Sequence, residues 1–224
     1  MLLVAVVAVL WCGVLPCKAS GEVVYRAVIE TDQRCVALTF DDGPHPKYTP
    51  QILDILKEYG IKATFFCVGS NADFYPALIE RIVAEGHEIG NHTYHHDHVS
   101  KMSTQALRSD ILACNEALGH TVTTPIKLFR PPEGICNDAV INVCAELGMT
   151  VVIWSVDTRD WAHPTIAEIC RNVRTNTHNG SIILMHDFIG KKSPTPEALR
   201  QIIPMLQGSG FEFVTVSQLL SVQK

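Results

Sequence analysis

The sequence is short of positive charge. Its 224 residues carry 18 Lys and Arg against 23 Asp and Glu, which gives a formal net charge of -5, and no run of Lys and Arg forms a basic arm. A protein that binds nucleic acid needs positive charge to neutralise phosphates, so a nucleic-acid partner is not expected. There is also no Cys-x-x-Cys pair, and a zinc site built on cysteines therefore has little support.

Low-complexity tracts, internal repeats and long linkers are absent after Ala19, which favours one folded domain. The eight cysteines do not indicate a disulfide framework. Cys67 lies inside an apolar run, and Cys114, Cys144 and Cys170 fall on apolar helical positions. Free cysteine is often a small buried hydrophobe, so we expect thiols in the core.

The N-terminus differs from the rest of the chain. No charged residue stands between Leu2 and Pro16, in a run that is too short for a comfortable membrane span but suits the apolar region of a signal peptide. Cleavage after Ala19 is one expectation, and an uncleaved N-terminal anchor is the alternative. We therefore expect an exported protein with no stable membrane partner beyond that anchor. The expected division is a signal peptide or anchor at 1–19, a lead-in at 20–34 and the folded domain at 35–224.

Short apolar runs alternate with segments of helical periodicity. The runs that predict strands are 35–40, 63–68, 88–91, 127–130, 150–154, 181–185 and 212–215. The segments that predict helices are 49–60, 78–86, 107–118, 140–148, 166–173 and 195–208. About seven strands alternating with helices indicate parallel βα units, in either an open doubly wound sheet or a barrel. In both folds the chemistry gathers at the C-terminal ends of the strands.

Titratable clusters do follow five of the seven predicted strands. They are Asp41-Asp42-Gly43-Pro44, His92-Thr93-Tyr94-His95-His96, Arg130-Pro131-Pro132-Glu133-Gly134, Asp157-Thr158-Arg159-Asp160-Trp161 and His186-Asp187. The first question is whether they bind a metal. His92 and His96 are four residues apart, so on a helical turn their rings would point the same way. Two imidazoles and one carboxylate leave open positions on a divalent ion, as in catalytic metal sites.

Asp41 and Asp42 are adjacent at a strand end, where successive side chains diverge, so one can bind metal while the other faces a substrate. The alternative is that the histidines are ordinary loop residues and the aspartates cap a turn. For a lone His-x-x-x-His that alternative would be favoured, but the other clusters at the same rim favour a metal centre.

The remaining groups suit hydrolysis of an amide. A metal lowers the pKa of bound water towards about 7, a free carboxylate can take the water proton, and a histidine can protonate the departing amine. Arg130 would keep that carboxylate ionised through a charge-assisted pair. Asp157 could orient His186 and raise its pKa, so that it stays protonated.

At this point the chain resembles a known family, the polysaccharide deacetylases (NodB homology domain, carbohydrate esterase family 4). The resemblance covers about residues 35–220. It is carried by five motifs in order: Thr39-Phe40-Asp41-Asp42-Gly43-Pro44, His92-Thr93-x-x-His96, Arg130-Pro131-Pro132-x-Gly134, Asp157-x-x-Asp160-Trp161 and Leu184-x-His186. It implies a distorted (β/α)7 barrel with the active site at the C-terminal ends of the strands, and makes 35–224 a deacetylase catalytic domain.

The resemblance also implies roles for single residues. Asp42, His92 and His96 are expected to hold Zn²⁺ or another divalent cation such as Co²⁺. Asp41 is expected to be the general base and His186 the general acid. Arg130 is then expected to tune the base, and Asp157 to tune the acid.

For substrate binding, the resemblance points to Leu184 and Trp161 as walls of the acetyl pocket, and to Pro132 and Glu133 beside them. Glu133 departs from the family pattern, which usually has an aromatic residue there. A backbone N–H can still serve the oxyanion at that position, because any residue except proline supplies one. The substitution bears on the groove wall and on substrate preference.

Other polar residues near the rim are expected to play indirect parts. His45, His98 and Asp187 are predicted to be supporting or surface groups, and His95 to face away from the metal. Asp160 is predicted to cap a helix entry, and Trp154 to belong to the core.

The expected reaction is release of acetate from N-acetylated amino sugars of a polysaccharide, with peptidoglycan N-acetylglucosamine favoured and chitin oligomers as the alternative. The lack of positive charge argues weakly against a dedicated anionic polymer. Two other readings of the same residues are a glycan-binding protein without catalysis and a non-haem iron oxygenase, which uses the same ligand set. A hydrolase of another small amide is a third.

Overall fold

The computed structural model describes residues 22–222, apart from 31–32, 189 and 191. The predicted signal peptide or anchor at 1–19 lies outside these residues, as does the cleavage position after Ala19. Among the helices that the structure describes, none has the length and apolar character needed to cross a bilayer. The cysteines within the described residues are free thiols, and all but the partly exposed Cys136 are buried, as their apolar positions predict.

The sheet is parallel and curled. Its strands are β1 (Val23–Val24), β2 (Cys35–Asp41), β3 (Thr64–Cys67), β4 (Glu88–Asn91), β5 (Leu128–Phe129), β6 (Thr150–Val152), β7 (Val156–Asp157), β8 (Ile182–His186) and β9 (Glu212–Val214). The strand order is β1-β6-β5-β4-β3-β2-β8-β7, and β9 pairs with β2. β6 and β7 come from one short stretch of chain, yet β6 pairs with β5 and β7 pairs with β8 at the other end of the order. The sheet therefore curls round into a half-barrel, which agrees with the predicted α/β barrel-like fold in one domain.

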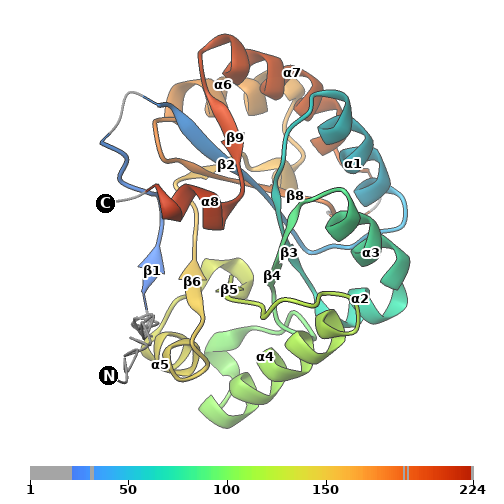
Figure 1. Cartoon of the computed structure of the whole chain (residues 1–224), viewed down its shortest axis with the longest axis vertical. Helices are drawn as coiled ribbons and strands as arrows, with labels where there is room; N and C mark the ends of the chain where they lie inside the picture. Colours follow the sequence, from blue (N-terminus) through green and yellow to red (C-terminus); the bar gives the residue numbers. More distant parts are fainter. Residues whose placement is uncertain (1–21, 31–32, 189, 191, 223–224) are drawn as a thin grey trace, which may run out of the picture.

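Helices surround this sheet. They are α1 (Tyr48–Glu58), α2 (Gly69–Phe74), α3 (Pro76–Ala84), α4 (Thr104–Gly119), α5 (Asp138–Glu146), α6 (Ile166–Asn176), α7 (Thr195–Gly208) and α8 (Val216–Ser221). Short 3₁₀ turns occur at η1 (Val99–Lys101), η2 (Pro132–Gly134) and η3 (Asp160–Ala162). In Figure 1 most helices form an outer ring, with α6 and α7 at the top, α1 and α3 at the right and α4 at the bottom. The six predicted helices are present, whereas α2, α8, β1 and β7 are short elements that periodicity did not indicate.

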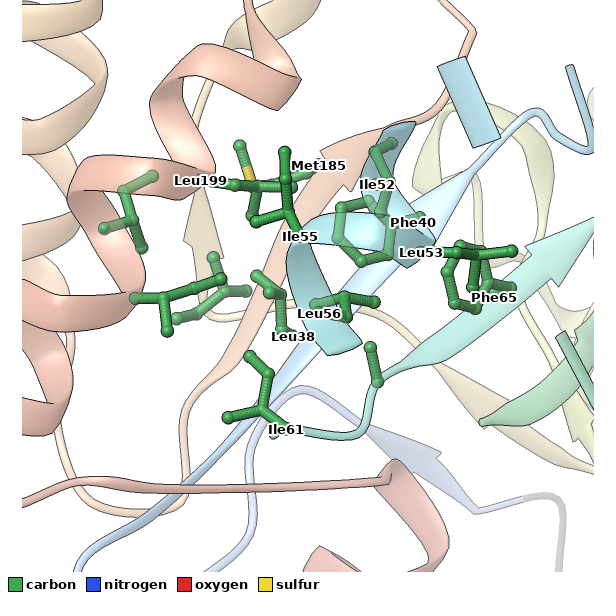
Figure 2. Packing of buried hydrophobic residues seen from close by; sticks show 14 of the residues in the cluster. Leu38, Phe40, Ile52, Leu53, Ile55, Leu56, Ile61, Phe65, Met185 and Leu199 are labelled. Carbon is green, nitrogen blue, oxygen red and sulfur yellow. The ribbon is translucent and has the colours of Figure 1, made fainter. Parts of the chain in front are cut away.

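β2 is the central strand, and every one of its residues is buried. Because side chains alternate along a strand, Leu38 and Phe40 pack in the cluster that contains α1, while Ala37 faces a second cluster. Figure 2 shows Leu38 and Phe40 beside Ile52 and Leu56 of α1. Burial of each such large apolar side chain stabilises the fold by about 1.5–3 kcal/mol. This packing on both faces holds the C-terminal end of β2 in place.

The start of α1 differs slightly from the prediction. The predicted segment begins at residue 49, but α1 begins at Tyr48, with Lys47 as its N-cap residue. The Thr49 hydroxyl instead accepts a hydrogen bond from the His45 N–H at 2.7 Å. α1 ends before Gly60, whose φ of 67° lies in the left-handed region that glycine adopts readily.

Candidate active site

The register of the sheet brings the predicted clusters to one level. Asp41 at the end of β2 pairs with His186 at the end of β8 and with Phe66 of β3. On the other side, Asn91 pairs with Phe129, so that His92 and Arg130 both follow the sheet at the same height. The parallel strands therefore deliver Asp41, His186 and His92 to one rim.

A pocket of about 470 Å³ opens at this rim, in the size range of small-ligand sites. Its lining residues are Asp41, Asp42, His92, His96, Glu133, Trp154, Asp157, Trp161, Leu184 and His186. Of the predicted site residues, only Arg130 and Pro132 are not in this lining, and both are buried. Trp154, predicted to belong to the core, packs against two apolar clusters and also lines the pocket; its position beyond the end of β6 was the available signal for the second role.

Asp42, His92 and His96 form a potential metal site. Asp42 Oδ1 lies 3.3 Å from His92 Nε2 and 3.0 Å from His96 Nε2. One donor atom from each residue falls within 4.8 Å of the others. Tetrahedral ligands at bond lengths near 2.1 Å stand about 3.4 Å apart, so this spacing suits a divalent ion.

The hydrogen bond of His92 selects the tautomer that a metal requires. His92 Nδ1 lies 2.7 Å from the carbonyl oxygen of Arg130. A carbonyl can only accept, so Nδ1 carries the proton and Nε2 keeps its lone pair for a cation. Burial opposes ionisation of Asp42, but its contacts with His92 and His96 hold its pKa below the ordinary value.

The two histidines do not share a helical turn, and that prediction is wrong. The segment after β4 is a loop in which Thr93 and His96 have left-handed φ values of 65° and 59°. Asn91 shapes the loop, because its Oδ1 accepts the Thr93 N–H at 2.8 Å. Its amide also donates to the carbonyl oxygen of Ile111 at 2.9 Å. Sequence reasoning missed Asn91, since an asparagine at a strand end has many other uses.

Arg130 is fully buried and makes contact with Asp41. Its Nη1 donates to Asp41 Oδ1 at 2.7 Å and to Thr39 Oγ1 at 2.8 Å. Nε and Nη2 donate to the carbonyl oxygens of Val152 and Ile153. Burial lowers the pKa of the guanidinium, and the charge of Asp41 opposes that effect. Three acceptors besides Asp41 therefore hold the guanidinium in place against that carboxylate.

The second carboxylate oxygen of Asp41 faces the potential metal site. Asp41 Oδ2 lies 3.8 Å from His92 Nε2, while Oδ1 is engaged by Arg130. Asp41 is therefore close to the site without sharing the donor contacts that Asp42 makes. Asp42 thus has the contacts that a metal ligand needs, and Oδ2 of Asp41 is left facing the site.

His186 is held by Asp160, not by Asp157. Its Nδ1 lies 2.8 Å from Asp160 Oδ1, and its backbone N–H donates to Oδ2 at 2.8 Å. Asp160 is completely buried and also accepts the Thr195 hydroxyl at 2.7 Å. Burial opposes protonation of His186, but the hydrogen bond and charge of Asp160, together with Asp41 and Asp42, raise its pKa to about 9.

The prediction that Asp157 contacts His186 is thus corrected. Asp157 Oδ1 accepts the Arg159 N–H at 2.8 Å and the Trp161 indole N–H at 3.4 Å. Arg159 has a left-handed φ of 58°, which turns the chain so that Asp160 reaches His186. The fold therefore gives Asp160, predicted as a cap, the place expected for Asp157.

The predicted substrate contacts lie around the same pocket. Leu184 is buried, whereas Trp161 is half exposed. Glu133 has a left-handed φ of 57°, and its Oε1 lies 3.1 Å from His98 Nδ1. Pro132, in the same turn, is buried. The departure at Glu133 thus places a carboxylate at the pocket wall.

The fold and the site together define a metal-dependent hydrolase, in which a three-donor metal site, a free carboxylate and a raised-pKa imidazole share one pocket. Residues 29–152 match the polysaccharide deacetylase family, and the chain belongs to this family.

Two curated relatives and one solved structure illustrate the similarity. The chain is 44% identical to a peptidoglycan-N-acetylglucosamine deacetylase of Bacillus cereus, over 91% of this chain and 95% of the relative. It is 36% identical to a chitooligosaccharide deacetylase of Azorhizobium caulinodans, over 83% and 94%. The crystal structure of the Bc1960 peptidoglycan N-acetylglucosamine deacetylase superimposes with a TM-score of 0.85 at 37% identity, covering 91% of this chain and 95% of that one.

Proposed function

We propose that this protein is an exported deacetylase that hydrolyses the acetamide of N-acetylglucosamine residues in peptidoglycan and releases acetate. The observation that carries the proposal is the grouping of Asp41 and His186 in one pocket with the Asp42–His92–His96 site. The substrate is supported by similarity to the peptidoglycan deacetylase of Bacillus cereus over nearly the whole chain. Export is supported by the location of that polymer in the cell wall.

The resident metal in this proposal is Zn²⁺ or a similar divalent cation such as Co²⁺, held by Asp42, His92 and His96. Two imidazoles and a carboxylate suit these ions and leave open positions for water and substrate. When bound, the cation polarises the acetamide carbonyl and makes water easier to ionise.

The chain's own residues then move the protons. Asp41 Oδ2 takes a proton from the attacking water, whose oxygen adds to the acetamide carbon, while Arg130 holds Asp41 in position through Oδ1. The backbone N–H of Glu133 is the proposed donor to the oxyanion.

Collapse of the adduct requires a proton on the leaving nitrogen. His186 donates it as the C–N bond breaks, which leaves acetate and a free amine on the sugar. With a pKa of about 9, His186 is protonated at neutral pH, as a general acid must be. Asp160 keeps the imidazole oriented, and Leu184 and Trp161 enclose the acetyl methyl group.

The decisive experiment measures acetate released from purified peptidoglycan after the metal-free protein is loaded with Zn²⁺, Co²⁺ or no metal. We expect release only with metal, and none from His92→Ala under any loading. Absence of acetate from every acetylated glycan and every metal would contradict the proposal. Glycan binding without release would favour a non-catalytic binder, and metal-dependent oxygen uptake would favour an oxygenase.

A second candidate is deacetylation of chitooligosaccharides. It is favoured by the similarity to the Azorhizobium caulinodans enzyme, and its substrate presents the same acetamide. Parallel kcat/KM values on peptidoglycan fragments and on chitin oligomers of matched length separate the two. A higher value on the chitin oligomers would overturn the peptidoglycan assignment while leaving the reaction intact.

A further inference from the structure

Asp187 is a buried acid that the hydrolytic scheme does not use. It directly follows His186, and its side chain is fully buried, which leaves the supporting role of the two predicted alternatives and excludes a surface position. Its backbone N–H donates to the carbonyl oxygen of Asp41 at 3.1 Å. Asp187 therefore lies under the turn that links the proposed base to the first metal ligand.

The carboxyl of Asp187 lies between Thr49 and Gly43. Its Oδ2 accepts a hydrogen bond from the hydroxyl of Thr49, which itself accepts the His45 N–H. Its Oδ1 is buried and has no hydrogen-bond partner among the described residues. A Cβ added at Gly43 would lie 2.1 Å from Oδ2 and 2.2 Å from Oδ1, so Gly43 packs directly on the carboxyl.

The turn above needs this support because its backbone is strained. Asp42 has a φ of 74°, and a residue other than glycine stays in that region only when its surroundings hold it there. Asn71 donates to the Asp42 carbonyl at 2.8 Å, and the Val68 N–H donates to the Gly43 carbonyl at 2.8 Å. These two hydrogen bonds hold the turn through its carbonyl groups, whereas the buried Asp187 carboxyl packs against it from the core.

We propose that Asp187 is a positioning residue, whose carboxyl between Gly43 and Thr49 sets where Asp42 presents its carboxylate to a metal ion. The inference rests on the proposed metal site, but it concerns affinity for the ion and not the reaction. Residues that support metal ligands without touching the metal contribute about 10- to 100-fold to metal affinity in other proteins.

Shape and hydrogen bonding, not charge, perform this role. Burial, together with the nearby Asp42 and Asp41, raises the pKa of Asp187 to about 7, although the Thr49 hydrogen bond opposes this shift. Asparagine has nearly the same shape and an oxygen that can accept the Thr49 hydroxyl. Asp187→Asn is therefore the conservative variant, and Asp187→Ala removes both features.

The test is a calorimetric titration of metal-free full-length protein with Zn²⁺ alone. Asp187→Ala should bind about 10- to 100-fold more weakly, and excess Zn²⁺ should restore its deacetylation rate. Asp187→Asn should keep most of the affinity. As a control, Val36→Ala, a buried position near the start of β2, should lower the melting temperature without changing Zn²⁺ affinity.

Unchanged affinity in Asp187→Ala would overturn the inference, as would an Asp187→Asn variant that binds as poorly as Asp187→Ala. A wild-type protein that binds no divalent cation would instead contradict the metal site and with it the proposed function.

Gly43→Ala tests the same contact with Asp187 intact, and it decides the matter if Asp187→Ala does not fold. Gly43→Ala should weaken Zn²⁺ binding, because its methyl group meets the Asp187 carboxyl, and unchanged Zn²⁺ affinity would overturn the inference. Where Asp187→Ala folds, combining it with Gly43→Ala removes the atoms nearest to that methyl group, so the double variant should bind Zn²⁺ more tightly than Gly43→Ala alone. Additive losses would show that the two residues do not act through their contact.

Discussion

The contact between Asp160 and His186 predicts a large shift in the pH dependence of the enzyme. In Asp160→Asn the carboxylate charge beside His186 Nδ1 is lost while the side-chain volume is kept. A general acid must be protonated, so activity falls as the pH rises through its pKa. With the wild-type pKa raised to about 9, the alkaline limb should lie near that value. Without Asp160 the pKa should return to the ordinary 6.5 or below, because burial of His186 lowers it.

The size of the effect follows from the protonated fractions. At about pH 7.5, a group of pKa 9 is about 97% protonated and a group of pKa 6.5 about 9% protonated. The rate at that pH should therefore drop about tenfold through protonation alone, and acidification should recover part of it. The NH₂ group of the asparagine would also face two of the donors whose hydrogen bonds Asp160 accepts. The free energy of unfolding should therefore fall by about 1–3 kcal/mol.

The assay is kcat/KM against pH for acetate release, at temperatures where circular dichroism shows each variant folded. Asp157→Asn is the matched control, because Asp157 lies in the same pocket but does not contact His186. Its alkaline limb should stay near that of the wild type. An unmoved limb in Asp160→Asn, or a larger shift in Asp157→Asn, would refute the reasoning.

Three further predictions concern the same site. Asp41→Asn should lower turnover by about 10²- to 10⁴-fold while Zn²⁺ binding by calorimetry stays intact, whereas His92→Ala should lose the metal; near-normal turnover in Asp41→Asn would make the assigned base wrong. Arg130→Ala leaves Asp41 buried without its partner and should cost about 3–5 kcal/mol in urea unfolding, so a loss below 1 kcal/mol would show that the pair is dispensable. Because the pKa of His186 is raised, its contribution to stability is fully present below pH 6.5 and is lost as the pH rises through about 9; the free energy of unfolding should decline over this range, and an equal decline in Asp160→Asn would contradict the assignment.

Much of the fold could be predicted because it depends on local patterns. All seven apolar runs that predicted strands contain one, and all six segments with helical periodicity contain a helix. Very short elements were missed: β1 and β7 have two residues each and α8 has six. Elements of that length carry too few positions for a period to show, and their pairing partners decide whether they form.

The candidate site could be predicted in part, for a related reason. In parallel βα units the polar residues after each strand must gather at one edge of the sheet. The sequence alone therefore predicts that Asp41, Asp42, His92 and His186 lie near one another. The distances and hydrogen bonds between these side chains could not be predicted in this way. Because Arg159 has a left-handed φ, Asp160 contacts His186 in place of Asp157. Because Thr93 and His96 also have left-handed φ values, the segment between the two histidines is a loop and not the expected helical turn.

The amino-acid order by itself determined which side chains meet at the rim, since alternating apolar runs and helices dictate the strand direction and therefore the shared edge. Only the tertiary structure decided which carboxylate holds which imidazole and which acid lies buried beneath the metal turn. Those contacts depend on backbone angles of single residues and on hydrogen bonds between distant segments, such as Asp187 to Thr49, that no local spacing encodes.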